Sequence, residues 1–253
     1  MKRTTLQRGD ARLSIRDYGG DGAPLVLIHG LGASQKAWAN LIAALDDRYR
    51  IITYDQRGHG ASTRSSDYSW SLFVGDLEAL VSELALTKFS LVGHSLGVGV
   101  ALEVASQTSA CRAVTMIDGA FSVELPPPDT SQIDRVQHSP LYPIWRRLGR
   151  LRSRGLSMSL VDALAVAEEY RAQFANWEQA LCGLDCRAQY LLAAVEAPAP
   201  NGPPTQAARR ATAELAVTLN PLVEVHWIDA GHAMARTHPQ EVAKSVMELQ
   251  LKS

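Results

Sequence analysis

The chain of 253 residues is poor in cysteine and carries almost no net charge. Its three cysteines, Cys111, Cys182 and Cys186, lack the spacing of a disulfide framework, which predicts free thiols in a reducing compartment. No pair of histidines accompanies Cys182 and Cys186, so we expect no metal site there. The net charge of -1 argues against general attraction to nucleic acids or to anionic membrane surfaces.

Long apolar runs are also missing. None reaches the length of about 18 residues that a membrane-spanning helix requires. The first eight residues, MKRTTLQR, lack the apolar centre of a signal peptide. We therefore expect a cytoplasmic protein without a membrane partner. The hydrophobic content of 46% is nevertheless ample for the core of a single domain.

The most informative motif is the pentapeptide GHSLG at residues 93–97. It follows a short apolar run at 89–92 and precedes a helix-compatible stretch at 98–106. This order predicts a strand, a sharp turn and a helix, with Ser95 at the apex. Small residues two positions on either side of the serine allow the strained turn that exposes its hydroxyl. The alternative is a glycine-rich turn with an incidental serine.

A second motif, HGLG at residues 29–32, follows the buried-strand run at 24–28. Acyl transfer from a serine requires backbone N–H donors aimed at the oxygen that becomes negative. One donor would be the amide of Leu96, directly after the serine. The other would come from the loop after the third strand, at Leu31. The alternative for this motif is an ordinary turn at a strand end.

A serine hydroxyl is a poor nucleophile until a base removes its proton, and histidine is the usual base near neutral pH. Of the seven histidines, His232 stands in a loop between the expected last strand, 223–228, and an amphipathic final helix, 239–251. These positions favour His232 as the base. A lone histidine is more often structural, and we expect that of most of the others.

Strand-like and helix-like segments alternate along the chain. We expect strands at 13–18, 25–28, 50–54, 89–92, 113–117, 190–195 and 223–228, and early helices at 38–45 and 71–86. This alternation predicts a mostly parallel sheet with helices on both faces. Ligands of such sheets bind at the carboxyl ends of the strands. Ser95, Leu31 and His232 all follow predicted strands, so they should share one site.

Together with DQRGHGAS at residues 55–62, these motifs resemble the α/β-hydrolase superfamily. The resemblance implies an α/β fold with a mostly parallel central sheet flanked by helices. It also implies a helical cap inserted after the sixth strand. We place the core at residues 1–119 and 185–253 and the cap at 120–184. The 55–62 loop would be structural, with Asp55 and Arg57 fixing the turn by hydrogen bonds.

The expected cap begins with an extended proline run at 126–128 and continues with helix-like pieces around 141–151 and 156–177. Aromatic residues of a cap can line the substrate pocket. We select Tyr142 and Trp145 as pocket residues because both lie near prolines that interrupt helix. The alternative is that the cap aromatics form the core of the cap itself.

The third catalytic group, which orients the histidine, departs from the family pattern. Most of the superfamily places an aspartate just after the strand that here ends near Val195, but the expected Gly-x-x-Asp is missing and Pro198 stands there. Glu196 is the nearest carboxylate. A minority takes the acid from the end of the preceding strand, where this chain has Asp118. We choose Asp118, with Glu196 as the alternative acid, although Asp118 could also be a simple turn residue.

These features predict a serine hydrolase that needs no cofactor and no metal. Its substrate would be a small ester, lactone or thioester with an apolar portion, and nucleic acid is not expected as a partner. A serine at the turn disfavours the dehalogenase and epoxide hydrolase branches, which use aspartate there. Acyl transfer, carbon–carbon bond hydrolysis, cofactor-free peroxidation, a non-hydrolytic biosynthetic catalyst and a small-molecule binding protein stay open as alternatives. The sequence leaves the oligomeric state open.

Overall fold

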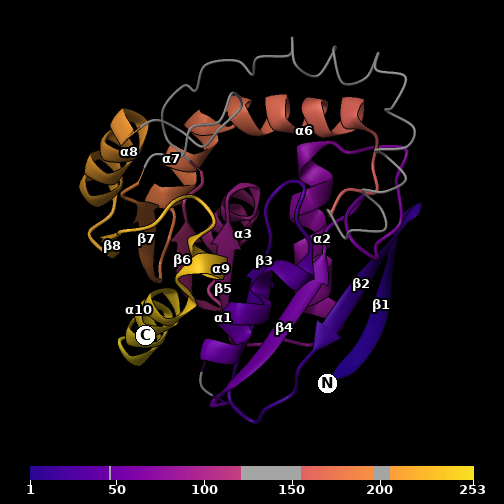
Figure 1. Ribbon diagram of the computed structural model, residues 1–253, viewed down its shortest axis with the longest axis horizontal. Helices are drawn as coiled ribbons and strands as arrows, with labels where there is room; N and C mark the ends of the chain where they lie inside the picture. The colour runs from indigo at the N-terminus through magenta and orange to yellow at the C-terminus, as the bar shows by residue number, and fades with distance from the viewer. Residues whose placement is uncertain (46, 121–154, 196–205) are drawn as a thin grey trace.

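A computed structural model describes residues 1–45, 47–120, 155–195 and 206–253. Its centre is an eight-stranded sheet with the order β1-β2-β4-β3-β5-β6-β7-β8 (Figure 1). Strands β1 and β2 run antiparallel to their neighbours, and all other pairs are parallel. The strands are β1 (Lys2–Arg8), β2 (Ala11–Asp17), β3 (Ala23–Ile28), β4 (Tyr49–Asp55), β5 (Phe89–His94), β6 (Cys111–Ile117), β7 (Arg187–Ala193) and β8 (Val223–Ile228). The predicted α/β class is confirmed.

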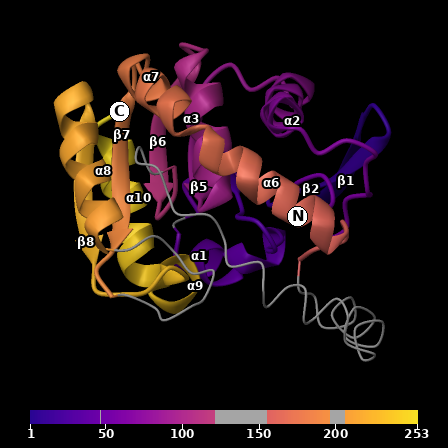
Figure 2. The same cartoon turned by 90° about the horizontal axis from the view of Figure 1, so that it is seen from above.

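The helices cover both faces of the sheet, which explains why the inner strands read as continuous apolar runs. Helices α2 and α3 lie on one face, and α1, α9 and α10 lie on the other (Figure 2). The described helical elements are η1 (Gln35–Trp38), α1 (Ala39–Ala44), α2 (Trp70–Glu83), α3 (Leu96–Ser106), α6 (Leu160–Ala172), α7 (Phe174–Cys182), α8 (Gln206–Leu219), α9 (Met234–Thr237) and α10 (Pro239–Leu251).

Strand register brings the ends of distant segments together. Ile28 pairs with Gly93, and His94 pairs with Ile117. Ile117 in turn pairs with Leu191 on β7. The loops after β3, β5, β6 and β7 therefore emerge side by side from one edge of the sheet, as the sequence predicted for a shared site.

In the described part of the chain between β6 and β7, where the cap was expected, lie helices α6 and α7. Helix α6 packs on α2, and α7 packs on α3. The segment 156–177, expected as one helical piece, begins its helix only at Leu160, because Ser159 and Asp162 form a capping box there. It is then divided between Ala172 and Phe174. The expected proline run at 126–128 and helix at 141–151 lie outside the described residues.

Helix α9 was not predicted, and three further described elements differ from the sequence expectation. Strand β1 was not predicted, because its polar residues match an edge strand that only pairing with β2 stabilises. The helix expected at 38–45 is a 3₁₀ turn followed by the short α1. Helix α8 was not predicted, and its hydrophilic composition explains why. Among the described residues, no helix combines the length and the apolar character needed to cross a lipid bilayer.

Candidate active site

Ser95 occupies a strained turn between β5 and α3. Its backbone has φ 54° and ψ −122°, outside the regions that L-residues favour. The turn packs so tightly on β3 that a Cβ atom at Gly97 would lie 2.2 Å from the carbonyl oxygen of Ile28. The Ser95 amide donates to the Ile117 carbonyl at 2.9 Å, which fixes the turn to the end of β6. This is the strand–turn–helix arrangement that the pentapeptide predicts.

The loop after β3 lies directly against Ser95. A Cβ atom at Gly30 would stand only 2.8 Å from the Cβ atom of Ser95. The loop turns back on itself, because the Ala33 amide donates to the Gly30 carbonyl at 3.2 Å, and Leu31 lies within this turn. Leu96 is the first residue of α3, where backbone N–H groups have no partner inside the helix.

His232 and Asp118 are hydrogen-bonded to each other. The distance from His232 Nδ1 to Asp118 Oδ2 is 2.7 Å, with Asp118 fully buried and the His232 side chain 29% exposed. An ionised carboxylate can only accept, so Nδ1 donates and Nε2 is left as the acceptor of a neutral ring. This tautomer is the one that a general base of a serine nucleophile needs.

A buried arginine contacts the same carboxylate. Arg209 of α8 donates from Nε to Asp118 Oδ1 at 2.7 Å and from Nη2 to Oδ2 at 2.8 Å. The amide of Ala193, at the end of β7, donates to Oδ1 at 3.3 Å. Burial by itself raises the pKa of Asp118, but the hydrogen bonds from Arg209 and His232 outweigh it and hold that pKa well below its usual range. Asp118 is therefore a carboxylate at neutral pH.

His94, the residue before Ser95, holds the His232 loop in place. Its Nε2 donates to the backbone carbonyl of His232 at 2.8 Å, and the two ring centroids are 4.6 Å apart. Burial lowers the pKa of His94 to about 4, so this ring is neutral at pH 7. The neutral ring adds no second positive charge beside His232.

Tyr170 links the inserted helix α6 to the strained turn. Its hydroxyl donates to the Ser95 carbonyl at 3.1 Å and accepts from the Ala120 amide at 2.7 Å. The ring lies between Trp70 and Trp177, with centroid distances of 5.7 and 4.6 Å. The insert is thus tied to the backbone of Ser95 itself.

A family model described as the alpha/beta hydrolase family matches residues 25–245. The chain belongs to the alpha/beta hydrolase family.

Among relatives of this alpha/beta hydrolase is a protein named carbamate hydrolase RutD of Enterobacter cloacae, 35% identical over 43% of this chain and 42% of the relative. Another is the non-heme chloroperoxidase CPO-A1 of Kitasatospora aureofaciens, 40% identical over 36% of this chain and 34% of the relative. The chain thus spans less than half the length of these curated relatives.

Solved structures resemble the chain over its whole length. A bromoperoxidase from Bacillus anthracis has a TM-score of 0.75 at 22% identity and covers 100% of both chains. The enol-lactonase from Burkholderia xenovorans has a TM-score of 0.74 at 18% identity, with coverage of 98% of this chain and 100% of its own. At these identities the likeness shows the fold alone.

The DQRGHGAS loop of this alpha/beta hydrolase is tied together internally. Asp55 accepts from the amides of Gln35 and Ala61 at 2.7 and 2.9 Å. Arg57 makes a buried, two-point ion pair with Asp76 at 2.9 and 2.7 Å. These bonds agree with the structural role expected for Asp55 and Arg57.

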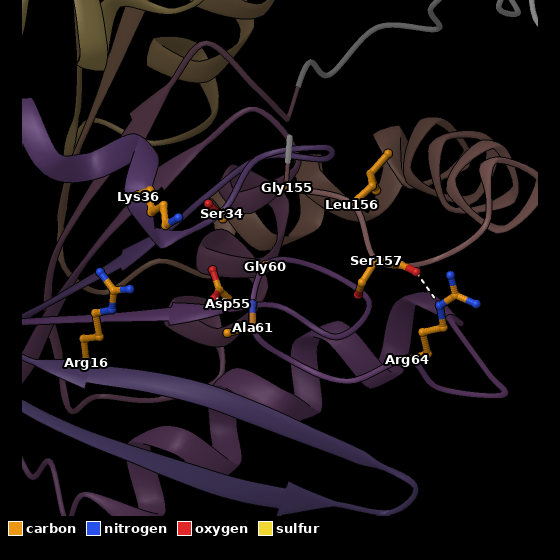
Figure 3. Close-up of a pocket in the computed structure, with 10 residues that line it drawn as sticks. All are labelled: Arg16, Ser34, Lys36, Asp55, Gly60, Ala61, Arg64, Gly155, Leu156 and Ser157. Carbon is orange, nitrogen blue, oxygen red and sulfur yellow. Dashed lines mark hydrogen bonds between the residues drawn. The ribbon is translucent and has the colours of Figure 1, made fainter. Parts of the chain in front are cut away.

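A pocket of about 510 Å³ lies beside the same loop (Figure 3). Arg16, Lys36 and Arg64 surround it, and Arg64 donates to the Ser157 carbonyl. Its described lining contains neither Ser95 nor His232. This basic pocket therefore opens beside the β4 loop and not at the strained turn.

The predicted site residues Ser95, Leu31, Leu96, Asp118 and His232 all gather at one edge of the sheet. Glu196, Tyr142 and Trp145 lie outside the described residues. Among the described residues, no cluster of three or more histidine, cysteine or acidic side chains is placed to hold a metal ion.

Sequence reasoning missed Arg209. The sequence offers no signal for it, because the residues that α8 buries, Arg209, Thr212 and Ala216, do not form an apolar stripe. An arginine on a buried helix face requires a carboxylate partner, because an unpaired charge there is too costly.

Proposed function

We propose that this alpha/beta hydrolase is a serine hydrolase that cleaves a carboxylic ester, lactone or thioester through an acyl-enzyme. Ser95 is the nucleophile, His232 the general base and Asp118 the acid that orients it. The observation that carries the proposal is the 2.7 Å hydrogen bond between His232 Nδ1 and the buried Asp118, beside the strained turn at Ser95. The relative named carbamate hydrolase supports a hydrolytic reaction.

In this proposal the Ser95 oxygen attacks the substrate carbonyl carbon while Nε2 of His232 takes the hydroxyl proton. The carbonyl oxygen becomes an oxyanion and accepts hydrogen bonds from the amides of Leu31 and Leu96. His232 then donates its proton to the leaving alcohol or thiol, and the acyl group stays on Ser95. Water, activated by the same histidine, releases the acid product and restores the serine.

The substrate would be small and partly apolar, held between the core and the cap at residues 120–184. Tyr142 and Trp145 are the cap residues we propose for its apolar walls. Since the curated matches cover less than half of each relative, their substrates do not define the substrate of this chain.

A fluorophosphonate probe tests the proposal directly, because it phosphonylates only an activated serine. We expect labelling of the native protein and its loss in Ser95→Ala, measured by intact-mass spectrometry. Hydrolysis of a panel of p-nitrophenyl esters, thioesters and lactones should be lost in parallel. A folded wild-type protein that stays unlabelled and hydrolyses none of them would instead favour a binding protein or a non-hydrolytic catalyst.

A further inference from the structure

The titratable and charged groups around His232 come from four elements. Asp118 follows β6, Arg209 lies on α8, His94 ends β5, and Tyr170 lies on α6. His94 is neutral, and burial raises the pKa of the Tyr170 hydroxyl, so that it is also neutral near pH 7. The charge balance at His232 is therefore decided by Asp118 and Arg209.

We propose that Arg209 is a positioning residue that fixes the Asp118 carboxylate toward His232 and sets the pH range over which His232 accepts a proton. The inference rests on the proposed function, because it assigns a role within the same catalytic unit.

The geometry of the ion pair between Arg209 and Asp118 supports the positioning role. A guanidinium that donates from two nitrogens to both carboxylate oxygens holds the plane of the carboxylate. Arg209 does so at 2.7 and 2.8 Å, and the side chains of both partners are fully buried. Asp118 Oδ2 then accepts from Arg209 and from His232 at once. Rotation of the carboxylate would break the Arg209 contacts, so the direction of the His232 hydrogen bond is fixed.

The positive charge of Arg209 acts on the electrostatic field that Asp118 exerts at His232. The guanidinium is charged at every pH the protein can experience, so Arg209 cancels most of the field of Asp118. A carboxylate without such a partner stabilises a protonated imidazole more strongly than this paired carboxylate does. Removal of Arg209 should therefore strengthen the attraction between Asp118 and a protonated His232.

Arg209 is not required merely to satisfy the hydrogen bonds of Asp118. Asp118 already receives the amide of Ala193 and Nδ1 of His232, which is sufficient to satisfy a buried carboxylate with hydrogen bonds. Burying a second charged group, the Arg209 guanidinium, in the same interior site costs free energy because that group loses its hydration. Arg209 therefore acts on the placement and charge of Asp118, and does more than satisfy its oxygens.

The test compares Arg209→Met, which removes the charge, with Arg209→Lys, which keeps the charge but loses the two-point contact. The matched control is Arg210→Met, which removes the same charge from the exposed neighbour on α8. Each protein is first checked for folding by circular dichroism. The pH dependence of kcat/KM is then measured on one activated ester.

In Arg209→Met the acidic limb of the profile should move to higher pH by about one unit or more, since a unit charge removed within a few ångströms changes a protonation constant at least about tenfold. In Arg209→Lys the limb should stay in place while kcat falls about tenfold through misplacement. Arg210→Met should match wild type.

A limb that does not move in Arg209→Met would reduce Arg209 to a purely structural residue. If Arg209→Met does not fold, Arg209→Lys decides, because wild-type kcat in that variant would overturn the positioning role.

A spectroscopic readout separates this inference from the proposed function. The ring nitrogens of His232 are followed by ¹⁵N NMR between pH 4 and 9, with the signals assigned by His232→Gln. The midpoint of the titration should be higher in Arg209→Met than in wild type by about one pH unit or more. This result would stand even if wild-type Ser95 proved inert toward the fluorophosphonate probe. An unchanged midpoint would refute the role of Arg209 whether or not the protein is a hydrolase.

Discussion

Asp118 Oδ2 lies 2.7 Å from His232 Nδ1 although the two residues are 114 positions apart. In the sheet, β7 separates the strands that precede them. Asp118 therefore reaches past the end of β7, where it accepts the Ala193 amide at 3.3 Å. Its backbone φ of 46° bends the chain at this point. A carboxylate that follows β6 can thus reach a histidine that follows β8.

Ser95→Ala should lower kcat/KM on the preferred ester by at least about 10³-fold, because the remaining groups cannot form an acyl-enzyme. His232→Ala should be comparably damaging, and the double variant no worse, since the two residues act as one unit. Ser245→Ala, on α10, is the matched control and should retain activity. Near wild-type turnover by folded Ser95→Ala would show that the nucleophile is another residue.

Asp118→Asn should lower kcat by about 10⁴-fold, because an amide can hold the histidine in the wrong tautomer. Glu196→Gln should have a mild effect. Both are measured as steady-state kcat on the same ester, alongside thermal unfolding to show that the variants are folded. The opposite pattern would move the acid to Glu196, and a small effect of both would indicate a Ser95–His232 dyad.

Tyr170→Phe should lower the free energy of unfolding by about 1–3 kcal/mol, because the buried Ala120 amide loses its acceptor. Denaturant unfolding measures this change. The control is Tyr18→Phe, at a partly buried residue packed against the hydrophobic cluster under α1 and α10. It should change stability less. Equal stability of Tyr170→Phe and wild type would show that α6 is not held through this hydroxyl.

The protein should lose stability as the pH falls from 6 to 5. Burial lowers the pKa of His29, His59 and His94 to about 4, 3 and 4. The unfolded chain therefore binds protons in this range that the folded chain does not. Each histidine removes about 1.4 kcal/mol of unfolding free energy per pH unit once the pH is well below 6.5. Urea unfolding at several pH values measures the slope.

His59 provides the internal check on this slope. Its Nδ1 donates to the Arg57 carbonyl and its Nε2 accepts from the Gly32 amide, so protonation would break the second bond. His59→Gln should reduce the pH slope by about a third. His238→Gln, at an exposed position, should leave the slope as it is. A slope unaffected by His59→Gln would assign the acid sensitivity to other groups.

Tyr142→Ala and Trp145→Ala should change the ranking of acyl groups by kcat/KM more than they change thermal stability. The reason is that pocket walls select substrates, whereas core residues mainly stabilise the fold. The measurement is a panel of acyl chain lengths together with melting temperatures. A lower melting temperature with an unchanged ranking would place both residues in the core of the cap.

The sequence alone determined most of the architecture. Apolar runs predicted every strand from β2 to β8, and the final helix begins and ends where expected, at Pro239 and Leu251. The turn at Ser95 was predictable because local contacts require its glycines: a Cβ atom at Gly93 would lie 2.4 Å from the Gly97 carbonyl oxygen. Hydrophobic periodicity along the chain does not identify helices or strands that lack an apolar pattern. Hence the edge strand β1 and the hydrophilic helix α8 were not predicted.

Only the tertiary structure decided what surrounds Asp118. The sequence offered Asp118 and Glu196 as acids, but a hydrogen bond across 114 positions depends on strand order and register. Arg209 lies 91 positions from Asp118 along the chain. The sequence of the helix that carries it gave no signal of this partner. The physical reason is that sequence motifs reflect the local backbone conformation of residues adjacent along the chain. The pairing of buried charges depends on which segments the sheet brings together.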